Sequence, residues 1–356
     1  MSEPLLFITE EAPFPPVGGR RIREALFIKL LSEKVPVEVL YFRKGNPTQE
    51  MPVASLRGLF APSELANVTF TQIRSPSFLM WGQPLIQALK QRAAPGRLIW
   101  FSGPKMYDYF FRARAMGYKI VCDDDGVPRK YLSGADLIVV PTEAEAGRVR
   151  KISREARLQV IPNFVDTPYF EKLCTHQGQS LLFSGSLDYE PNIKGLYWFV
   201  EEILPRLRAA LREKMPRVVV AGNNPSPALN DHLRSHAVDV RANPSSMLDL
   251  IGEAAIVFIP VREGGRTQIK ILQAMASGRC VVTTGNATEG LALTPTYDVF
   301  VSDQPDSFAS DILRLVTNPD LRKEVGNHAL KTVKDRYDWT CIGPLLDQLL
   351  KGFQRT

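Results

Sequence analysis

The sequence predicts an α/β protein made of two Rossmann-like domains. Short apolar runs rich in β-branched residues recur along the chain, and amphipathic stretches of helical length separate them. Strands and helices that alternate in this way form parallel sheets covered by helices on both faces. The pattern lapses once, into turn-forming and polar residues over 160–179, and 356 residues exceed one ordinary core.

The apolar runs fit strands that are buried on both faces, because they are short, β-branched and almost free of charge. Several of them end in Gly, Ser, Asp or Pro, which is typical of a turn at the end of a strand. The clearest amphipathic helices are 22–34 and 196–214. The expected strands are 5–9, 37–42, 68–73, 97–103, 119–123, 135–142, 180–186, 217–222, 238–241, 254–260, 280–285 and 298–303.

The interruption divides the chain into two expected domains, over residues 1–165 and 175–335. A helix near 340–356 is expected to pack back on the first domain. Ligands of open parallel sheets collect at the carboxyl ends of the strands. Two such domains facing each other would therefore place their ligands in a shared cleft.

The composition is that of a globular protein, with 44% hydrophobic and 23% charged residues. We find no leader and no apolar run near the length of a membrane span, so we expect neither secretion nor a transmembrane segment. Dispersed cysteines favour reduced thiols in the cytoplasm over a disulfide framework. They are Cys122, Cys174, Cys280 and Cys341.

The formal net charge of +6 is concentrated in the first half. Residues 1–165 carry 23 Lys and Arg against 16 Asp and Glu. This excess would suit a phospholipid surface, a lipid pyrophosphate or a nucleic acid. The cations are spread out, however, and residues 19–23 form the densest cluster. An ordinary solvated surface therefore explains the charge equally well.

The segment "FIPVREGGRTQIKILQAMASG" has the features of a phosphate site. Its strand ends at Pro260, Gly264 and Gly265 allow close backbone approach, and Thr267 is a plausible N-cap. The helix start offers free N–H groups and the positive end of its dipole to an anion. The alternative is a turn whose glycines only permit close packing. Cationic side chains flank the helix start at Arg262, Arg266 and Lys270.

Two other strand ends repeat this arrangement. The strand expected at 180–186 ends in Ser-Gly-Ser at Ser186, and Lys194 follows where we expect a helix to start. Lys194 could reach the same anion, or it could be an ordinary exposed lysine. Near the N-terminus, Gly18 and Gly19 precede a helix expected at about Arg20, and they could present backbone amides to a diphosphate.

Three acids, Asp123 to Asp125, end the strand expected at 119–123. A carboxylate cluster there suggests a Mg²⁺ ligand, a general base or a hydroxyl-binding group. At most two of the three can face one ligand, because successive strand residues point in opposite directions. Aspartates that merely form a turn or cap a helix are the alternative.

Several stretches, in the order in which they occur along the chain, resemble the retaining glycosyltransferases of the GT-B type, close to glycosyltransferase family 4 (glycosyl transferases group 1). The resemblance covers nearly the whole chain. It is carried by "PFPPVGGRRIREALFIKLL", "ADLIVVPTEAEAGRVR", "VIPNFVDTPYF", "LLFSGSLDYEPNIKGLYWFVEEILPRL", "ILQAMASGRCVVTTGNATEGL" and "RYDWTCI".

The resemblance implies that the second domain binds the donor. Gly264 and Gly265 match the loop that cradles the diphosphate, and Lys194 matches the lysine that neutralises it. The family's ribose-binding acid falls on Gln273, its other glutamate on Gly265, and a common arginine on Ser186. The histidine near the donor sugar has no counterpart. Asp123 or Asp125 is then the best remaining candidate for contacting the transferred sugar.

The implied reaction is a metal-independent, retaining transfer of a hexose from a nucleotide diphosphate sugar. The acceptor is a hydroxyl of a cell-surface glycan or of a lipid-linked or protein-linked precursor. The resemblance implies no cofactor and no nucleic-acid partner. It implies a cytoplasmic protein, and peripheral contact of the basic first half with the inner face of the plasma membrane is left open. The departures motivate one alternative, a non-catalytic nucleotide-sugar sensor or partner subunit. A sugar-nucleotide epimerase with two Rossmann-like domains is a weaker alternative.

Overall fold

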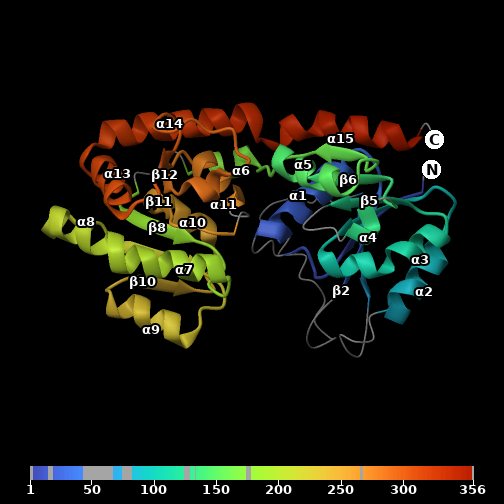
Figure 1. Ribbon diagram of the computed structural model, residues 1–356, viewed down its shortest axis with the longest axis horizontal. Coiled ribbons are helices and arrows are strands. Elements are labelled where there is room, and N and C mark those ends of the chain that lie inside the picture. Colours follow the sequence, from blue (N-terminus) through green and yellow to red (C-terminus); the bar gives the residue numbers. More distant parts are fainter. Residues whose placement is uncertain are drawn as a thin grey trace. The chain divides into compact units, whose positions relative to one another are not determined.

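The computed structural model describes residues 3–14, 19–42, 67–73, 82–123, 129–132, 134–173, 178–264 and 268–354. The chain divides into two compact units (Figure 1). Unit 1 is Met1–Asn163 together with Thr340–Thr356, and unit 2 is Phe164–Trp339. The borders expected from the sequence were 165 for the first domain and 175 and 335 for the second.

Unit 1 is built on a parallel sheet with the strand order β3-β2-β1-β4-β5-β6-β7. The chain moves outward from β1 to β2 on one side and continues from β4 on the other. β1 and β4 therefore flank a topological switch point. The strands are β1 Leu5–Thr9, β2 Val37–Phe42, β3 Val68–Ile73, β4 Leu98–Ser102, β5 Lys119–Asp123, β6 Leu137–Val140 and β7 Leu158–Val160.

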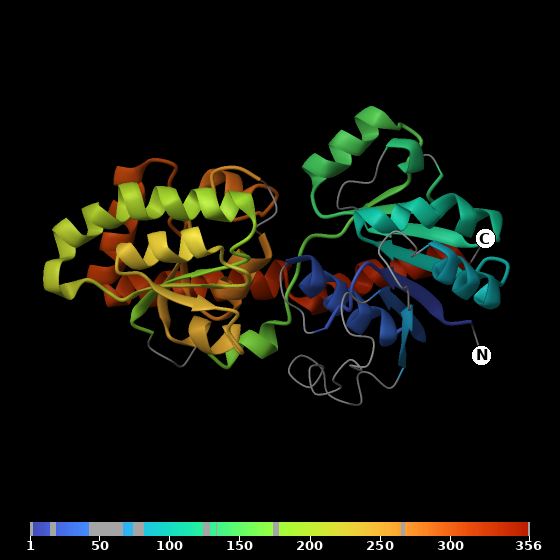
Figure 2. The same ribbon diagram turned by 90° about the horizontal axis from the view of Figure 1, so that it is seen from below.

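Helices cover both faces of this sheet. One face packs on residues of α2, α3, α4 and α5, and on the other Phe27 of α1 contacts Trp100 at 4.9 Å between ring centroids. The last helix, α15, belongs to unit 1, drawn in red in Figure 2. The helices are α1 Gly19–Ser32, α2 Gly82–Arg92, the 3₁₀ helix η4 Pro104–Tyr109, α3 Phe110–Ala115, α4 Arg129–Leu132, α5 Glu143–Ile152 and α15 Trp339–Gln354.

Unit 2 is built on a second parallel sheet, in the order β10-β9-β8-β11-β12-β13. Here β8 and β11 flank the switch point, because the chain runs outward from each in opposite directions. The strands are β8 Ser180–Ser184, β9 Val218–Gly222, β10 Asp239–Ala242, β11 Ala254–Ile259, β12 Cys280–Thr283 and β13 Phe300–Val301.

The helices of unit 2 also lie on two faces of their sheet. Figure 1 shows α7, α8 and α9 on one side and α14 on the other, and the two hydrophobic clusters of the unit fill these layers. The helices are α6 Thr167–Glu171, α7 Glu190–Trp198, the π-helix η5 Phe199–Ile203, α8 Leu204–Leu211, η6 Arg212–Lys214, α9 Pro227–Ser235, α10 Met247–Gly252, α11 Gln268–Ala276, α12 Gly285–Thr288, α13 Pro305–Thr317 and α14 Pro319–Arg336.

The predicted α/β class with two parallel sheets is confirmed, and two details of the prediction were wrong. The helix expected at 196–214 begins at Glu190 and contains a π-helical turn. Pro205 lacks a backbone N–H, and the helix accommodates it with the longer bond from Leu204 N to the carbonyl of Phe199. Strand β7, at Leu158–Val160, was not predicted, since its three residues are only half-buried.

Candidate functional site

The candidate site lies in unit 2, where the carboxyl ends of β8 and β11 meet at the switch point. Two helices begin just after these strands, α7 after β8 and α11 after β11. We call this region the β8–β11 edge and define it by Gly185, Ser186, Asn192, Gly264 and Lys270. Ligands of doubly wound sheets bind at such an edge.

Glycines allow the backbone segments of this edge to approach closely. A side chain at Gly195 of α7 would place its Cβ 2.4 Å from the carbonyl oxygen of Pro260, just after β11. Gly264 has a φ of 78°, and a Cβ there would lie 2.6 Å from Pro191. The glycine therefore lets the loop after β11 rest on the start of α7.

Lys270, in the first turn of α11, brings a cation to the edge. Its ammonium donates a hydrogen bond to Oδ1 of Asn192 at 2.8 Å and lies 4.7 Å from the ring centroid of Phe183. A Cβ at Gly185 would come within 2.9 Å of the same nitrogen, so the glycine leaves room for it. Burial lowers the pKa of Lys270 to about 7. Among the described residues no carboxylate pairs with it.

Asn192 joins two of the predicted residues and was missed by the sequence analysis. It is 3% exposed, and its amide also donates to the carbonyl oxygen of Ser186 at 2.7 Å. The structure thus brings Ser186 and Lys270 together through this one side chain. A sequence signal was present, because Asn192 shares with Gly195 and Leu196 the face of α7 that is buried.

Lys194 lies beside the edge, but carboxylates already balance its charge. Its ammonium is 2.6 Å from Oε1 of Glu263 and 3.1 Å from Oε1 of Glu190, and the hydrogen bond to Glu263 raises its pKa. The side chain is 55% exposed. Arg262 is exposed as well, with its guanidinium 5.0 Å from the ring centroid of Trp198. Both cations therefore have partners within unit 2.

Gln273 follows Lys270 by one turn of α11 and is half-buried. In the part of the chain that the structure describes, its side-chain amide has no hydrogen-bond partner; its backbone carbonyl accepts from Ser277. The amide is therefore free to meet a ligand hydroxyl. Gly265, Arg266 and Thr267, which the sequence also assigned to donor binding, lie outside the described residues.

The predicted residues of unit 1 have a different setting. Asp123 is 5% exposed and forms an ion pair with Arg23 of α1 at 3.1 Å. Gly19 is the exposed first residue of α1. Gly18 and Asp125 lie outside the described residues. Contact of Asp123 with a sugar stays a prediction, and its observed partner is structural.

A buried acidic cluster at the β1–β4 switch point was also missed. Glu24 of α1 is 1% exposed and accepts a hydrogen bond from the Ser102 hydroxyl at 2.8 Å. Burial raises the pKa of Glu24 to about 7, against a smaller lowering by Arg20. Glu10 accepts from the backbone N–H of Lys105 at 2.7 Å. No sequence signal identified these acids, because their burial comes from the packing of α1 against β1 and β4.

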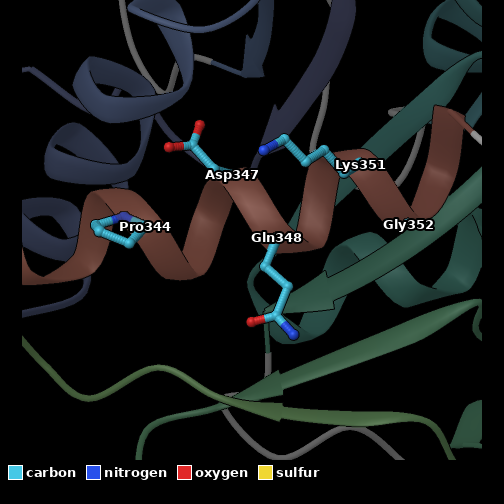
Figure 3. A pocket seen from close by; sticks show the side chains of 5 residues that line it. All are labelled: Pro344, Asp347, Gln348, Lys351 and Gly352. Atoms are coloured by element: carbon cyan, nitrogen blue, oxygen red, sulfur yellow. The ribbon is translucent and has the colours of Figure 1, made fainter.

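Unit 1 also carries an open pocket of about 460 Å³ along α15. Figure 3 shows Asp347 and Lys351 on one side of the helix and Gln348 on the other. Its described lining consists of Pro344, Asp347, Gln348, Lys351 and Gly352. None of the predicted site residues lines it.

The described residues contain neither a metal-binding cluster nor a helix that could span a membrane. No group of three or more His, Cys, Asp or Glu side chains there is placed to hold a metal ion. No described helix combines the length and the apolar composition that crossing a bilayer requires.

The sequence of unit 2 matches a known family. Residues 178–318 match the family described as Glycosyl transferases group 1. A relative, the "Uncharacterized 44.6 kDa protein in cps region" of Klebsiella pneumoniae, is 23% identical over 168 residues. That match covers 45% of this chain and 42% of the relative, so the chain spans less than half of the relative's length.

Solved structures resemble the chain over its whole length. A glycosyltransferase from Rickettsia africae has a TM-score of 0.70 at 13% identity, over 99% of this chain and 98% of that one. Anabaena HepE, in complex with UDP and glucose, has a TM-score of 0.70 at 15% identity, over 98% of this chain and 100% of that one. Sucrose-phosphate synthase from Thermosynechococcus elongatus has a TM-score of 0.77 at 15% identity, over 99% of this chain and 100% of that one. At such identities the likeness shows the fold.

Proposed function

Because unit 2 carries a glycosyl transferases group 1 domain and the chain has a GT-B fold, we propose that this protein is a retaining glycosyltransferase. It moves a hexose from a nucleotide diphosphate sugar to a hydroxyl of a cell-surface glycan or of its lipid-linked or protein-linked precursor. The observation that carries the proposal is Lys270, a half-buried lysine at the switch point whose ammonium has an amide as its described polar partner.

The proposed role of the β8–β11 edge is to offset the charge that grows on the departing diphosphate. Lys270 supplies a cation in the first turn of α11, where the helix dipole also favours an anion. Such groups stabilise a transition state most when they are already in place before the reaction. The bonds to Asn192 and the ring of Phe183 hold the ammonium in this way.

The rest of the proposed site follows from the same reaction. Lys194 and Arg262 add charge at the rim, and Gln273 accepts a hydrogen bond from the ribose. The reaction needs no metal in this account, because protein cations and backbone amides meet the diphosphate. Retention places the acceptor on the face of the leaving group, whose own phosphate oxygen takes the acceptor proton. This last step rests on the resemblance.

The names of the structural relatives support the substrate classes. HepE is described in complex with UDP-glucose, and TarM in complex with UDP and α-GlcNAc-glycerol. WaaG is described as a glycosyltransferase involved in lipopolysaccharide biosynthesis. For the present chain we propose a cytoplasmic location and peripheral contact of its basic first half with the inner face of the plasma membrane.

A second candidate function is binding of a nucleotide sugar without transfer, as a sensor or partner subunit. Two observations favour it. Gln273 replaces the acid expected at the ribose, and Asp123 is held in an ion pair with Arg23 instead of lying free for a sugar.

Nucleotide release distinguishes the two functions. The wild-type chain is incubated for hours with UDP-, GDP- and ADP-sugars, and the free nucleotide is measured. Lys270→Met is the matched control. Transfer predicts release of one nucleotide by the wild type, much reduced in the variant. Binding of a nucleotide with no release from any donor, with or without glycan acceptors, would leave only the sensor function.

A further inference from the structure

The buried face of α7 contains one polar side chain among apolar ones. Asn192 is 3% exposed, while the face continues with Gly195, Leu196 and Phe199. Burying an amide costs free energy unless its polar atoms find partners. Its bonds therefore show what the residue does.

Both ends of the Asn192 amide are bonded, and the partners determine its orientation. Nδ2 donates to the carbonyl oxygen of Ser186 at 2.7 Å, and a carbonyl needs a donor. Oδ1 accepts from the ammonium of Lys270 at 2.8 Å, and an ammonium needs an acceptor. An aspartate in this place would form an ion pair with the lysine and could not donate to the carbonyl while ionised.

The other described charges near this ammonium have partners of their own. On α7, Lys194 pairs with Glu190 and with Glu263, which lies after β11. Asp188, after β8, accepts a hydrogen bond from the amide of Asn224 at 3.1 Å. Arg262 is the remaining described charge in the loop after β11, and it lies over Trp198. The described surroundings thus hold the ammonium without a carboxylate.

We propose that Asn192 is a positioning residue that holds Lys270 in place without neutralising it, so that the ammonium keeps its charge for an anionic ligand. The identification of that anion as the diphosphate of a sugar nucleotide rests on the proposed function. The neutral amide accepts a hydrogen bond from one N–H group of the ammonium. The remaining N–H groups of the ammonium stay available to the phosphate oxygens.

The pKa of Lys270 distinguishes this positioning role from a purely structural one, because substitution of a purely structural residue would leave that pKa unchanged. Burial lowers the pKa of Lys270 to about 7. The Asn192 oxygen stabilises the charged form, so its removal lowers the pKa further. A carboxylate in its place raises the pKa, because an opposite charge favours the ammonium. The two substitutions therefore shift the titration in opposite directions.

The experiment measures binding of inorganic pyrophosphate and of UDP to the full chain by calorimetry. At pH 7, Asn192→Ala weakens binding roughly threefold by loosening the lysine, and Asn192→Asp weakens it about tenfold or more by neutralising it. In a Lys270→Met background, Asn192→Ala leaves the remaining affinity unchanged. Thermal unfolding of each variant reports whether it is folded.

The pH dependence provides the second measurement. The pH at which pyrophosphate affinity falls is expected to move down in Asn192→Ala and up in Asn192→Asp, by about one pH unit each. If Asn192→Asp fails to fold, the downward shift in Asn192→Ala still tests the inference. An unchanged affinity and an unchanged midpoint in Asn192→Ala overturn it, as does an Asn192→Asp variant that binds pyrophosphate as tightly as the wild type.

Failure of this inference differs from failure of the proposed function. A wild-type chain that transfers sugar while its Asn192→Asp variant keeps full affinity rejects the inference and leaves the function standing. A chain that binds pyrophosphate through Lys270 but releases nucleotide from no donor rejects the function and leaves the positioning role standing.

Discussion

The guanidinium of Arg23 and the carboxylate of Asp123 form a buried ion pair with a shortest N–O distance of 3.1 Å. The same guanidinium donates to the carbonyl oxygens of Ile161 and Pro162 and to the side chain of Asn163. One residue of α1 thus binds both the end of β5 and the residues at which the first segment of unit 1 ends. The acid that the sequence suggested for sugar contact is therefore the partner of a structural cation.

Arg23→Met is expected to destabilise unit 1 by about 3–5 kcal/mol, since it removes the guanidinium that balances the buried charge of Asp123. Asp123→Asn keeps the shape and removes that charge, so it should cost less on its own and relieve part of the loss when combined with Arg23→Met. Urea unfolding of the full chain measures both. Equal and additive losses would contradict an ion pair between the two residues.

Glu263 is expected to compete with a bound anion for Lys194. Glu263→Gln removes the carboxylate 2.6 Å from the ammonium and should tighten nucleotide binding, more so at low salt because the pair is exposed. Lys194→Met should weaken binding, although less than loss of the buried Lys270. The control is Glu263→Gln in a Lys194→Met background. Tightening that persists there would show that Glu263 acts without Lys194.

Gln273→Glu is expected to tighten nucleotide binding roughly fivefold if this side chain faces the ribose, because hydrogen bonds to ionised groups are about twice as strong. A carboxylate there also lies one turn from Lys270 and can pair with it. Inorganic pyrophosphate, which has no ribose, should therefore bind equally well or more weakly. Calorimetry with UDP and pyrophosphate separates the two effects. Weaker binding of both ligands would place Gln273 away from the ribose.

Nucleotide affinity is expected to fall as the pH rises from 7 to 9. Lys270 has a pKa lowered to about 7, so in the free protein it loses its proton over this range. The ligand contributes little, because the second pKa of a phosphate ester is about 6. Lys270→Arg stays charged and should give a flat profile. An equally steep fall in that variant would point to another titrating group.

The same pKa predicts how stability depends on pH. The unfolded lysine titrates near its ordinary pKa of 10.5, so between about 7 and that value the unfolded chain holds a proton that the folded chain has released. The contribution of Lys270 to stability therefore rises with pH over this window. Below it the buried ammonium is destabilising, and Lys270→Met should raise the unfolding temperature at pH 6 more than at pH 9.

The fold could be predicted because its strands are buried on both faces. Runs such as 5–9, 37–42 and 119–123 became strands with the expected bounds, since their five or six residues are mostly apolar and nearly all buried. Strand β7 was not predicted, because Leu158–Val160 is a short edge strand that is half-buried. The start of α7 at Glu190 was not predicted either, because the first turn of this helix lacks apolar residues at helical spacing.

The sequence predicted which residue types form the site, but it did not predict which of its lysines is exposed and paired with a carboxylate. The sequence identified both Lys194 and Lys270 as cations that follow the end of a strand. Only tertiary packing makes Lys194 exposed and paired with Glu263, and Lys270 half-buried beside Asn192. Asn192 was marked only by its place on the buried face of α7, because its contact with Lys270 joins residues that are distant in sequence.

Calorimetry of UDP, GDP and ADP shows whether Lys270 holds the diphosphate of the donor. At least one of the three nucleotides should bind the wild-type chain at pH 7. Lys270→Met should weaken that binding by about 1.5–3 kcal/mol, the range for a hydrogen bond to a charged group. Equal affinity of the folded variant and the wild type for every nucleotide would contradict this role of Lys270.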